Sequence, residues 1–439
     1  MRFRSESGNT SADSLQRGLA DGPVLAMNDE PISRNPHAFR SVTLGLFMTL
    51  LQVFVAVGLI APEGPLHYRY NTLIQHDSYW FANIVERGYG SILPPIEHKL
   101  MEVANVAFFP AYPASAAVLH HGLGLATYDA LLLAAQVAAW GFWSYFFLLC
   151  ARWDFSPVLQ FFGAAAVLSH PSAFFLVAGY SESLFLMGLL GFIFWSGATG
   201  RPAAVLAALH GFVMSATRIV GIPCAAYPVV RKIFESGWSG LRDVRGWFWR
   251  YGRPVLLMAA SVLGAISFFF YCQLRWGHWN LYMLTQEAGW DIHPDYLAVF
   301  KPASYRWLVP PLDDPTQWSQ MTMTVGALLF VAVAIAELLP ALRRRTHWQA
   351  RVALYFTAFI TYYIAVSGVA CVQMESMLRY QFCAHVLIVL AFLHFLAHLS
   401  TPSGPVRAVG MAVVALLCAA GLSLQGWWVW SFTRGGWVA

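Results

Sequence analysis

The sequence is poor in charged residues. Only 27 Lys and Arg and 22 Asp and Glu residues occur among 439, which is 11% of the chain, whereas 58% of the residues are hydrophobic. Ordinary soluble domains carry about 25% charged residues. The shortage of charge therefore excludes a soluble protein and predicts an all-α, polytopic membrane protein.

Cysteine is also scarce, and its spacing indicates no chemistry. All six cysteines lie inside or at the ends of apolar segments, and none forms a C-x-x-C or other ligand-like pair. They are Cys150, Cys224, Cys272, Cys371, Cys383 and Cys418. We interpret them as packing residues.

The first forty residues lack the apolar stretch of a cleavable signal. They are polar, mixed in charge and rich in Ser, Asn, Gly and Asp, so residues 1–40 are predicted to form a disordered cytoplasmic tail. Residues 41–425 are predicted to form the transmembrane domain, and residues 426–439 a short Trp-rich tail.

Long apolar runs dominate the rest of the chain. Because a membrane-spanning helix needs about 20 apolar residues, some of the runs are too short to cross alone. The sequence predicts a bundle of about 10–12 hydrophobic segments. The candidate segments are Ser41–Ala61, Asn105–His121, Ala126–Cys150, Pro157–Val177, Tyr180–Gly197, Ala203–Val220, Ile222–Val230, Val255–Gln273, Met321–Pro340, Val352–Cys371, Phe382–Leu399 and Ala408–Leu424.

The basic residues predict the orientation of the bundle. Two loops hold ten of the 27 Lys and Arg residues, and the positive-inside rule assigns both loops to the cytoplasm. The residues are Arg231, Lys232, Arg242, Arg245, Arg250, Arg253, Arg343, Arg344, Arg345 and Arg351. The long, more acidic loops 62–104 and 274–320 then lie on the external face. This rule also explains the net charge of +5, so no nucleic-acid partner is expected.

Two segments are irregular. If every segment between Asn105 and Gly197 crossed, the Tyr180–Glu182 turn would lie in the cytoplasm. We expect Asn105–His121 to be the segment that does not cross the membrane, because Pro110 and Pro113 disturb its first turn. Residues 203–230, with Arg218 near their middle, read as a broken helix. Non-helical backbone at membrane depth is tolerated only in protein or beside a cavity, so Arg218 is a site candidate.

The first external loop contains a carboxylate beside aromatic residues. Residues 78–88 predict a short helix that ends at Gly88, with Asp77 at its N-cap. One interpretation is that Asp77 only satisfies backbone donors. The other is that it accepts a proton from an attacking hydroxyl of a lipid-linked reaction, with His76 as a possible assistant.

Four stretches together resemble PIG-V-type mannosyltransferases, which are membrane glycosyltransferases of the GT-C class. The first is residues 76–89 with residues 105–113, which read HDxxWFxxIxxxGY and NVAFFPxYP. The others are AGYSESLF at 178–185, SATRxxG at 215–221 and SMLRY at 376–380. His76 stands where the family usually has Trp, and the acidic residue that follows Gly-Tyr in the family is missing after Tyr89.

The resemblance implies a GT-C-like fold and a polyprenyl-phosphate sugar donor, with mannose as the sugar. The acceptor is a lipid, glycan or protein hydroxyl on the external face. Asp77 would be the base of an inverting reaction, and Arg218 and Arg379 would contact the donor phosphate. The predicted substrate-binding residues are His76, Trp80, Phe109, Tyr112, Tyr180, Glu182, Arg218 and Arg379.

Several alternatives stay open. Glu182 has three candidate roles: it orients the acceptor, holds a divalent metal or caps its helix. Trp80 and Tyr112 also fit an interfacial aromatic belt. The rival classes are a secondary transporter, although no internal repeat is found, and a non-catalytic homologue. The expected location is the bacterial inner membrane, or the endoplasmic reticulum membrane in a eukaryote.

Overall fold

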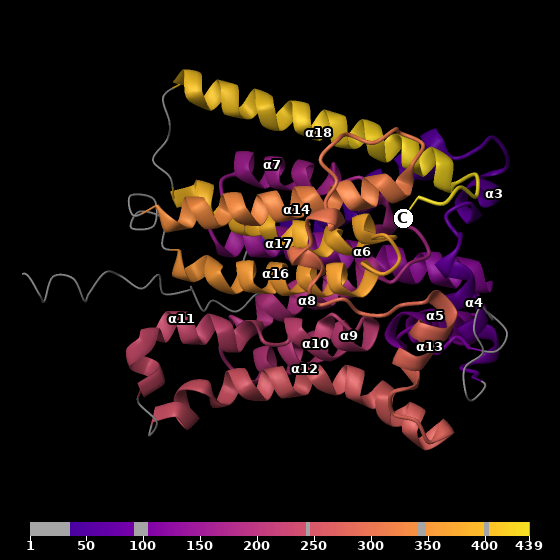
Figure 1. The fold of residues 1–439 in the computed structure, drawn as a ribbon, viewed down its shortest axis with the longest axis horizontal. Helices are drawn as coiled ribbons and strands as arrows, with labels where there is room; N and C mark the ends of the chain where they lie inside the picture. Colours follow the sequence, from indigo (N-terminus) through magenta and orange to yellow (C-terminus); the bar gives the residue numbers. More distant parts are fainter. Residues whose placement is uncertain (1–35, 92–103, 243–245, 340–347, 399–403, 439) are drawn as a thin grey trace, which may run out of the picture.

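The computed structural model describes residues 36–91, 104–242, 246–339, 348–398 and 404–438, and these contain helices and no strand. The long helices lie roughly along one direction, and short helices gather at one end (Figure 1). The N-terminal helices are α2 (Pro36–Val53) with its π-helical continuation η2 (Phe54–Ile60), α3 (Leu66–Asn71), α4 (Asp77–Arg87), α5 (Ala111–Leu123), α6 (Thr127–Arg152), α7 (Pro157–Leu168), η3 (Ala173–Leu176) and α8 (Glu182–Ser196). The later helices are α9 (Arg201–Thr217), α10 (Gly221–Cys224), α11 (Tyr227–Arg242), α12 (Trp247–Trp276), α13 (Leu281–Trp290), η5 (Ala298–Phe300), η6 (Pro302–Ser304), α14 (Pro315–Leu338), α16 (Gln349–Val369), α17 (Met377–His398) and α18 (Gly404–Phe432).

Seven helices of the described ranges are long and apolar enough to cross a membrane. They are α2 with η2, α6, α12, α14, α16, α17 and α18, and α7 and α8 are shorter apolar helices. The chain is thus an all-helical, multi-pass membrane protein, as predicted. Residues 201–242 divide into a 17-residue helix, one turn and a polar helix, so the predicted segments in this region do not each form a spanning helix.

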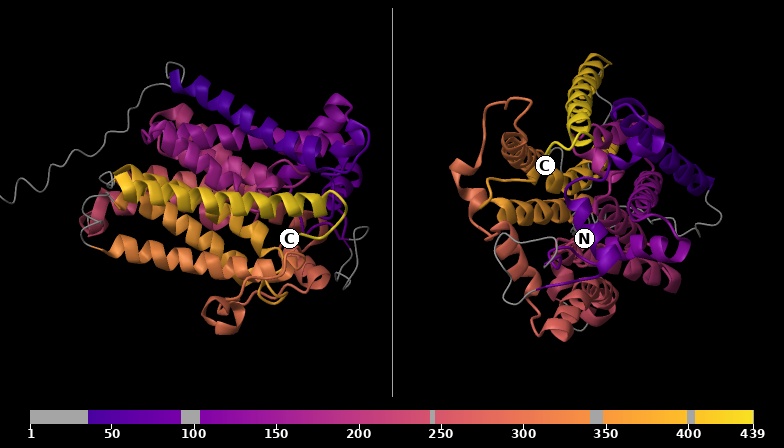
Figure 2. Two further views of the ribbon diagram at one scale, coloured as in Figure 1. Left: turned by 90° about the horizontal axis from the view of Figure 1, so that it is seen from above. Right: turned by 90° about the vertical axis from the view of Figure 1, so that its right-hand side faces the viewer.

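The two ends of the bundle differ in character. Helices α3, α4, α5 and α13 lie at one end, which we call the Asp77 end (Figures 1 and 2). The junction of α11 and α12 lies at the other end (Figure 1), which we call the basic end because Arg231, Arg250 and Arg253 line one cavity there. The predicted separation of Asp77 from the basic loop is therefore confirmed, although Arg245 and Arg343–Arg345 lie outside the described residues.

The turn before α8 belongs to the Asp77 end. The Tyr180 hydroxyl donates to the Gln75 carbonyl at 3.2 Å, and the Gly179 amide donates to the Leu73 carbonyl at 3.1 Å. Helix α5 has 13 residues, too few to span the bundle, and it begins after Pro110. Helix α5 therefore belongs to the segment between residues 105 and 197 that was expected not to cross.

A second interruption was not predicted. The expected segment Pro157–Val177 stops at Leu168, since the residue before Pro171 is disfavoured in a helix. The chain then passes through buried turns and η3 to reach Ser181. Gln425 of α18 donates to the Leu168 and His170 carbonyls at 2.9 and 2.7 Å, so these buried groups are satisfied.

The broken helix around Arg218 is confirmed. Helix α9 ends at Thr217, Arg218 is extended (φ −153°, ψ 144°), and α10 starts at Gly221. A Cβ on Gly221 would lie 2.6 Å from the Ser215 Cα and 2.7 Å from the Met214 oxygen. Only glycine therefore permits the chain to return so closely over the end of α9.

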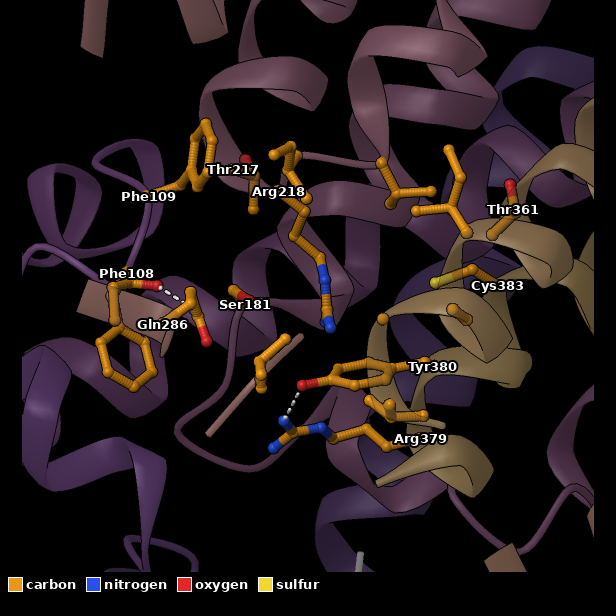
Figure 3. Close-up of a pocket in the computed structure, with 18 of the residues that line it drawn as sticks. Phe108, Phe109, Ser181, Thr217, Arg218, Gln286, Thr361, Arg379, Tyr380 and Cys383 are labelled. Atoms are coloured by element: carbon orange, nitrogen blue, oxygen red, sulfur yellow. Dashed lines mark hydrogen bonds between the residues drawn. The ribbon is translucent and has the colours of Figure 1, made fainter. Parts of the chain in front are cut away.

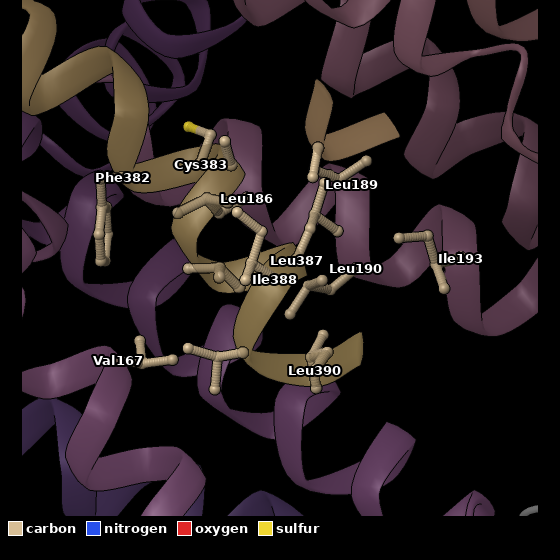
Figure 4. Packing of buried hydrophobic residues seen from close by; sticks show 14 of the residues in the cluster. Val167, Leu186, Leu189, Leu190, Ile193, Phe382, Cys383, Leu387, Ile388 and Leu390 are labelled. Carbon is tan, nitrogen blue, oxygen red and sulfur yellow. The ribbon is translucent and has the colours of Figure 1, made fainter. Parts of the chain in front are cut away.

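The core between these elements is apolar. Leu186, Leu189 and Leu190 of α8 pack with Leu387 and Ile388 of α17 (Figure 4). Both helices carry a site residue near their first turn, Glu182 on α8 and Arg379 on α17. Because the predicted segment Phe382–Leu399 begins at Met377 in the structure, Arg379 lies inside a packed helix and not in a loop.

The two termini of the described chain are more ordered than predicted. Helix α2 begins at Pro36, so residues 36–40 belong to it, and residues 1–35 lie outside the described part. Helix α18 continues to Phe432, and the following residues fold back over the loop before α4. His76 Nε2 lies 3.1 Å from the Gly436 carbonyl oxygen, and the Trp437 ring packs edge-on against His76 at 4.8 Å. The residues after Phe432 thus form a strap over the loop before α4.

Candidate functional site

Asp77 starts α4 and does not cap it. The N-cap is His76, whose backbone is in an unusual conformation (φ 48°, ψ −110°), and Asp77 is the first helical residue. The prediction of Asp77 as N-cap was therefore wrong by one position, and its carboxylate makes no capping bond. Oδ2 instead accepts a hydrogen bond from Arg379 Nη1 at 2.6 Å. Oδ1 accepts none from the described residues, and the side chain is 19% exposed.

Arg379 lies at the centre of a cluster of four charged side chains, the others being Asp77, Glu182 and Arg218. Its side chain is 6% exposed, and besides Asp77 it donates to the Tyr380 hydroxyl at 3.2 Å. Its Nε lies 3.2 Å from Glu182 Oε1, and its guanidinium also lies over the Tyr180 ring at 5.2 Å. Most of its donors are thus directed at groups of the protein.

Glu182 joins the two arginines. It is the first residue of α8 and 1% exposed, and its Oε1 accepts from Arg218 Nη1 at 2.5 Å. Its Oε2 is buried and has no hydrogen-bond partner among the described residues. The helix N-terminus favours a negative charge there, but no side-chain capping bond is made.

Arg218 is the more accessible of the two cations in the cluster. Its side chain is 16% exposed and uses Nη1 for Glu182. Nε and Nη2 make no hydrogen bond with the described residues, and the guanidinium lies 5.0 Å from the Tyr380 ring centroid. A planar guanidinium with open N–H groups is suited to a bidentate contact with phosphate.

The cluster as a whole is electrically balanced. Two carboxylates, Asp77 and Glu182, face two guanidiniums, Arg218 and Arg379, at distances of 2.5 to 3.2 Å. Isolated charges in a low-dielectric interior cost several kcal/mol each, so alternating signs make the arrangement possible. Charged residues placed inside a membrane bundle are expensive and indicate function.

The cluster opens into a cavity of about 440 Å³. Figure 3 shows Arg218, Arg379 and Tyr380 converging on one part of it, with Phe108, Phe109 and Gln286 on one side and Thr361 and Cys383 on the other. Ile364, Ala365 and Val369 of α16 add an apolar wall. The cavity therefore joins a polar end to an apolar side.

The predicted site residues divide into two groups. The lining of the cavity includes Asp77, Phe109, Tyr180, Glu182, Arg218 and Arg379. The other three predicted residues do not line it.

Tyr112, one of the predicted substrate-binding residues, does not line the cavity. Tyr112 is fully buried and donates to the Leu131 carbonyl at 2.9 Å, so it packs behind the cavity. Trp80 stacks on Phe108 at 5.5 Å, outside the lining. His76 points to the C-terminal strap through Gly436 and Trp437, and it is no direct partner of the Asp77 carboxylate.

Among the lining residues that sequence reasoning missed are Tyr282, Gln286 and Tyr380. Tyr282 and Gln286 come from α13, and Tyr380 follows Arg379. The spacing of Tyr282 and Gln286 places both on one face of a helix, which was a usable signal. Burial raises the pKa of the Tyr282 phenol.

A third carboxyl group, Glu375, lies beside the cluster, in the turn between α16 and α17. Burial raises the pKa of the Glu375 carboxyl, and Asp77 adds to the rise while Arg379 opposes it. Among the described residues, no group of three or more His, Cys, Asp or Glu side chains is arranged to hold a metal ion.

The fold and the cluster define a multi-pass, all-helical membrane protein with a charged cavity at one end. No protein-family model and no curated protein matches the sequence. Among solved structures, the chain is similar to ArnT from Cupriavidus metallidurans bound to undecaprenyl phosphate, with 13% identity and a TM-score of 0.48 over 90% of this chain and 75% of that one. It is similar to the same protein in the apo state, with 14% identity and a TM-score of 0.36 over 81% and 78%. At TM-scores below 0.5, neither likeness decides the function.

Proposed function

We propose that the protein is a membrane glycosyltransferase of the GT-C class, which moves a sugar from a polyprenyl-phosphate donor to a hydroxyl acceptor at the Asp77 end. One observation carries the proposal. A single cavity contains a carboxylate oxygen, Asp77 Oδ1, that accepts no hydrogen bond from the described residues, and a guanidinium, Arg218, with donors that these residues leave open. A base and a phosphate ligand are the two groups that this reaction needs.

The apolar side of the cavity suits the lipid part of the donor. The wall formed by Ile364, Ala365 and Val369 belongs to α16, which is a candidate membrane span. An isoprenoid chain that stays in the bilayer would lie along this wall, with its phosphate near Arg218. The sugar would then reach the space between Arg218 and Asp77.

The chemical step follows from these positions. Asp77 Oδ1 removes the proton of the acceptor hydroxyl while the acceptor oxygen bonds to the anomeric carbon. The bond from that carbon to the phosphate oxygen breaks, and polyprenyl phosphate leaves with the electron pair. Attack and departure on opposite faces invert the anomeric configuration. Arg218 stabilises the charge of the leaving phosphate.

Arg379 and Glu182 act as positioning residues in this proposal. Arg379 binds Asp77 Oδ2, which turns Oδ1 toward the cavity, and Glu182 fixes Arg218 through Nη1. The sequence had suggested the same phosphate contact for both arginines. The exposures of 16% for Arg218 and 6% for Arg379 favour Arg218 for that contact.

The sugar is proposed from the resemblance to PIG-V-type enzymes, which makes mannose the first donor to test. Purified protein in proteoliposomes would receive polyprenyl-phosphate mannose, glucose or galactose together with a membrane lipid extract as acceptor. The readout is sugar transfer to the extract and release of polyprenyl phosphate, with and without EDTA to establish any metal requirement. We expect transfer from one donor only.

Two results would contradict the proposal. One is the absence of turnover with every donor. The other is movement of intact donor across the membrane without cleavage, which would indicate a transporter. Turnover with glucose or galactose would keep the reaction class and replace mannose.

A further inference from the structure

A second cavity lies at the basic end of the bundle, far from the charge cluster. It has a volume of about 670 Å³ and is enclosed by α11, the start of α12 and the turn between α8 and α9. The side chains that matter are Arg231, Lys232, Arg250 and Arg253, with Glu235 and Trp249 beside them.

The lining is rich in positive charge. The described lining residues include four cations and one carboxylate. Glu235 is shared, with Arg231 Nε at 2.6 Å and Lys232 Nζ at 3.7 Å from its oxygens. Across residues 231–253 the sequence has six basic and two acidic side chains, a net charge of +4. The carboxylates of this segment therefore cannot neutralise it.

Backbone carbonyl oxygens orient two of the arginines. Arg250 Nη1 donates to the Gly240 carbonyl at 2.9 Å, and Arg253 Nη2 donates to the Ala198 carbonyl. Carbonyl oxygens fix the direction of a guanidinium without cancelling its charge. The cavity thus presents oriented cations, as a site for phosphate oxygens does.

The neighbouring surface is apolar and aromatic. Trp249, which lines the cavity, is 86% exposed, and Phe248 is 75% exposed. Leu256 and Leu263, further along the same helix α12, are also exposed. Aromatic residues beside cations at the end of a span are typical of the membrane interface.

We infer that this cavity binds the head group of an anionic phospholipid. The phosphate would lie among Lys232, Arg250 and Arg253, the glycerol near Trp249, and the acyl chains along the exposed apolar side of α12. Basic pockets between membrane helices on the cytoplasmic side are suited to such head groups. The inference does not depend on the proposed glycosyltransferase activity, because the site lies at the other end of the bundle.

Native mass spectrometry of the full chain tests the inference. The protein would be released from nanodiscs that contain equal amounts of phosphatidylglycerol and phosphatidylcholine. We expect retained phosphatidylglycerol to exceed phosphatidylcholine. The double variant Lys232→Gln with Arg253→Gln should retain about tenfold less phosphatidylglycerol, which corresponds to about 1.4 kcal/mol.

Three matched controls make the result decisive. Arg275→Gln removes a charge from the other end of α12 and should change nothing. Arg253→Lys keeps the charge and should retain lipid within about threefold of the wild type. The double variant should keep the unfolding temperature of the wild type in neutral detergent. If the double variant unfolds at a lower temperature, the inference is judged from lipid retention by Arg253→Lys and from the lipid preference of the wild type.

Three outcomes would overturn the inference. One is equal retention of the two lipids by the wild type. Another is undiminished phosphatidylglycerol in the double variant. The third is displacement of the lipid by inorganic phosphate at millimolar concentration, which would indicate a site for small anions only.

Discussion

The substitution Asp77→Asn gives the sharpest test of the proposed centre. The amide keeps the shape of the side chain but cannot take the acceptor proton, so turnover should fall by about 10²- to 10⁴-fold. Donor affinity should change by less than about fivefold, which is under about 1 kcal/mol, because Arg218 keeps its contacts with Glu182 and the cavity. The assay is turnover and polyprenyl-phosphate sugar binding in reconstituted protein.

The same change also affects the Arg379 guanidinium. Arg379 loses its ion pair with Asp77, but the Tyr380 hydroxyl and Glu182 remain within 3.2 Å, and the amide oxygen can still accept. We therefore expect a loss of about 1–3 kcal/mol of stability and a folded protein. The matched control is Asp291→Asn, an exposed carboxylate at the end of α13. Turnover within about tenfold of the wild type, in folded Asp77→Asn protein, would refute Asp77 as the base.

Four further substitutions probe the surroundings. Arg218→Gln should weaken donor binding by about 1.5–3 kcal/mol, because it removes charge-assisted bonds to phosphate; unchanged affinity in a binding assay would contradict this role. Trp437→Ala should lower turnover more than donor affinity, since the Trp437 ring supports His76, and Trp437→Phe should restore it; equal loss of both parameters would indicate a structural effect. Gly221→Ala should lower the unfolding temperature and donor affinity together, by about 1–3 kcal/mol of stability, because its Cβ would meet the backbone at 2.6 Å. Glu375→Gln should stabilise the protein at neutral pH and have no effect near pH 4. The raised pKa of Glu375 means that native stability is full below the unfolded pKa and decreases as pH rises through the native pKa; unfolding temperatures that ran parallel with pH for both proteins would show that Glu375 makes no such contribution.

Local signals in the sequence were sufficient to predict helix α4 and the break in the helix at Arg218. Residues 77–87 form one helix that ends at Gly88 (φ 73°), as expected from the spacing of its apolar residues. The break follows from Gly221 and Pro223, which interrupt the apolar run. The interruption at Pro171 was missed although the same kind of signal was present.

Long-range pairing could not be read from the sequence. Asp77 and Arg379 are 302 positions apart, and nothing in either motif specifies that their charges meet. The sequence identified Asp77 and Arg379 as site candidates. It could not tell which of the two arginines, Arg218 or Arg379, binds protein groups and which faces the cavity. That distinction depends on how α17 packs against α8. The C-terminal strap over His76 is likewise a tertiary contact between distant segments.

The arrangement of the cluster would allow it to bind the phosphate of the proposed donor while its ion pairs stay intact. With two positive and two negative side chains it is neutral when empty, so each charge has a partner inside the bundle. A phosphate that displaced Glu182 from Arg218 would leave a carboxylate that is 1% exposed without a cation on that side. Because Nε and Nη2 of Arg218 are open toward the cavity, the phosphate can bind while Nη1 stays on Glu182. Binding of the proposed donor would therefore add charge at the accessible edge of the cluster and leave the Asp77–Arg379 pair, which orients the proposed base, intact.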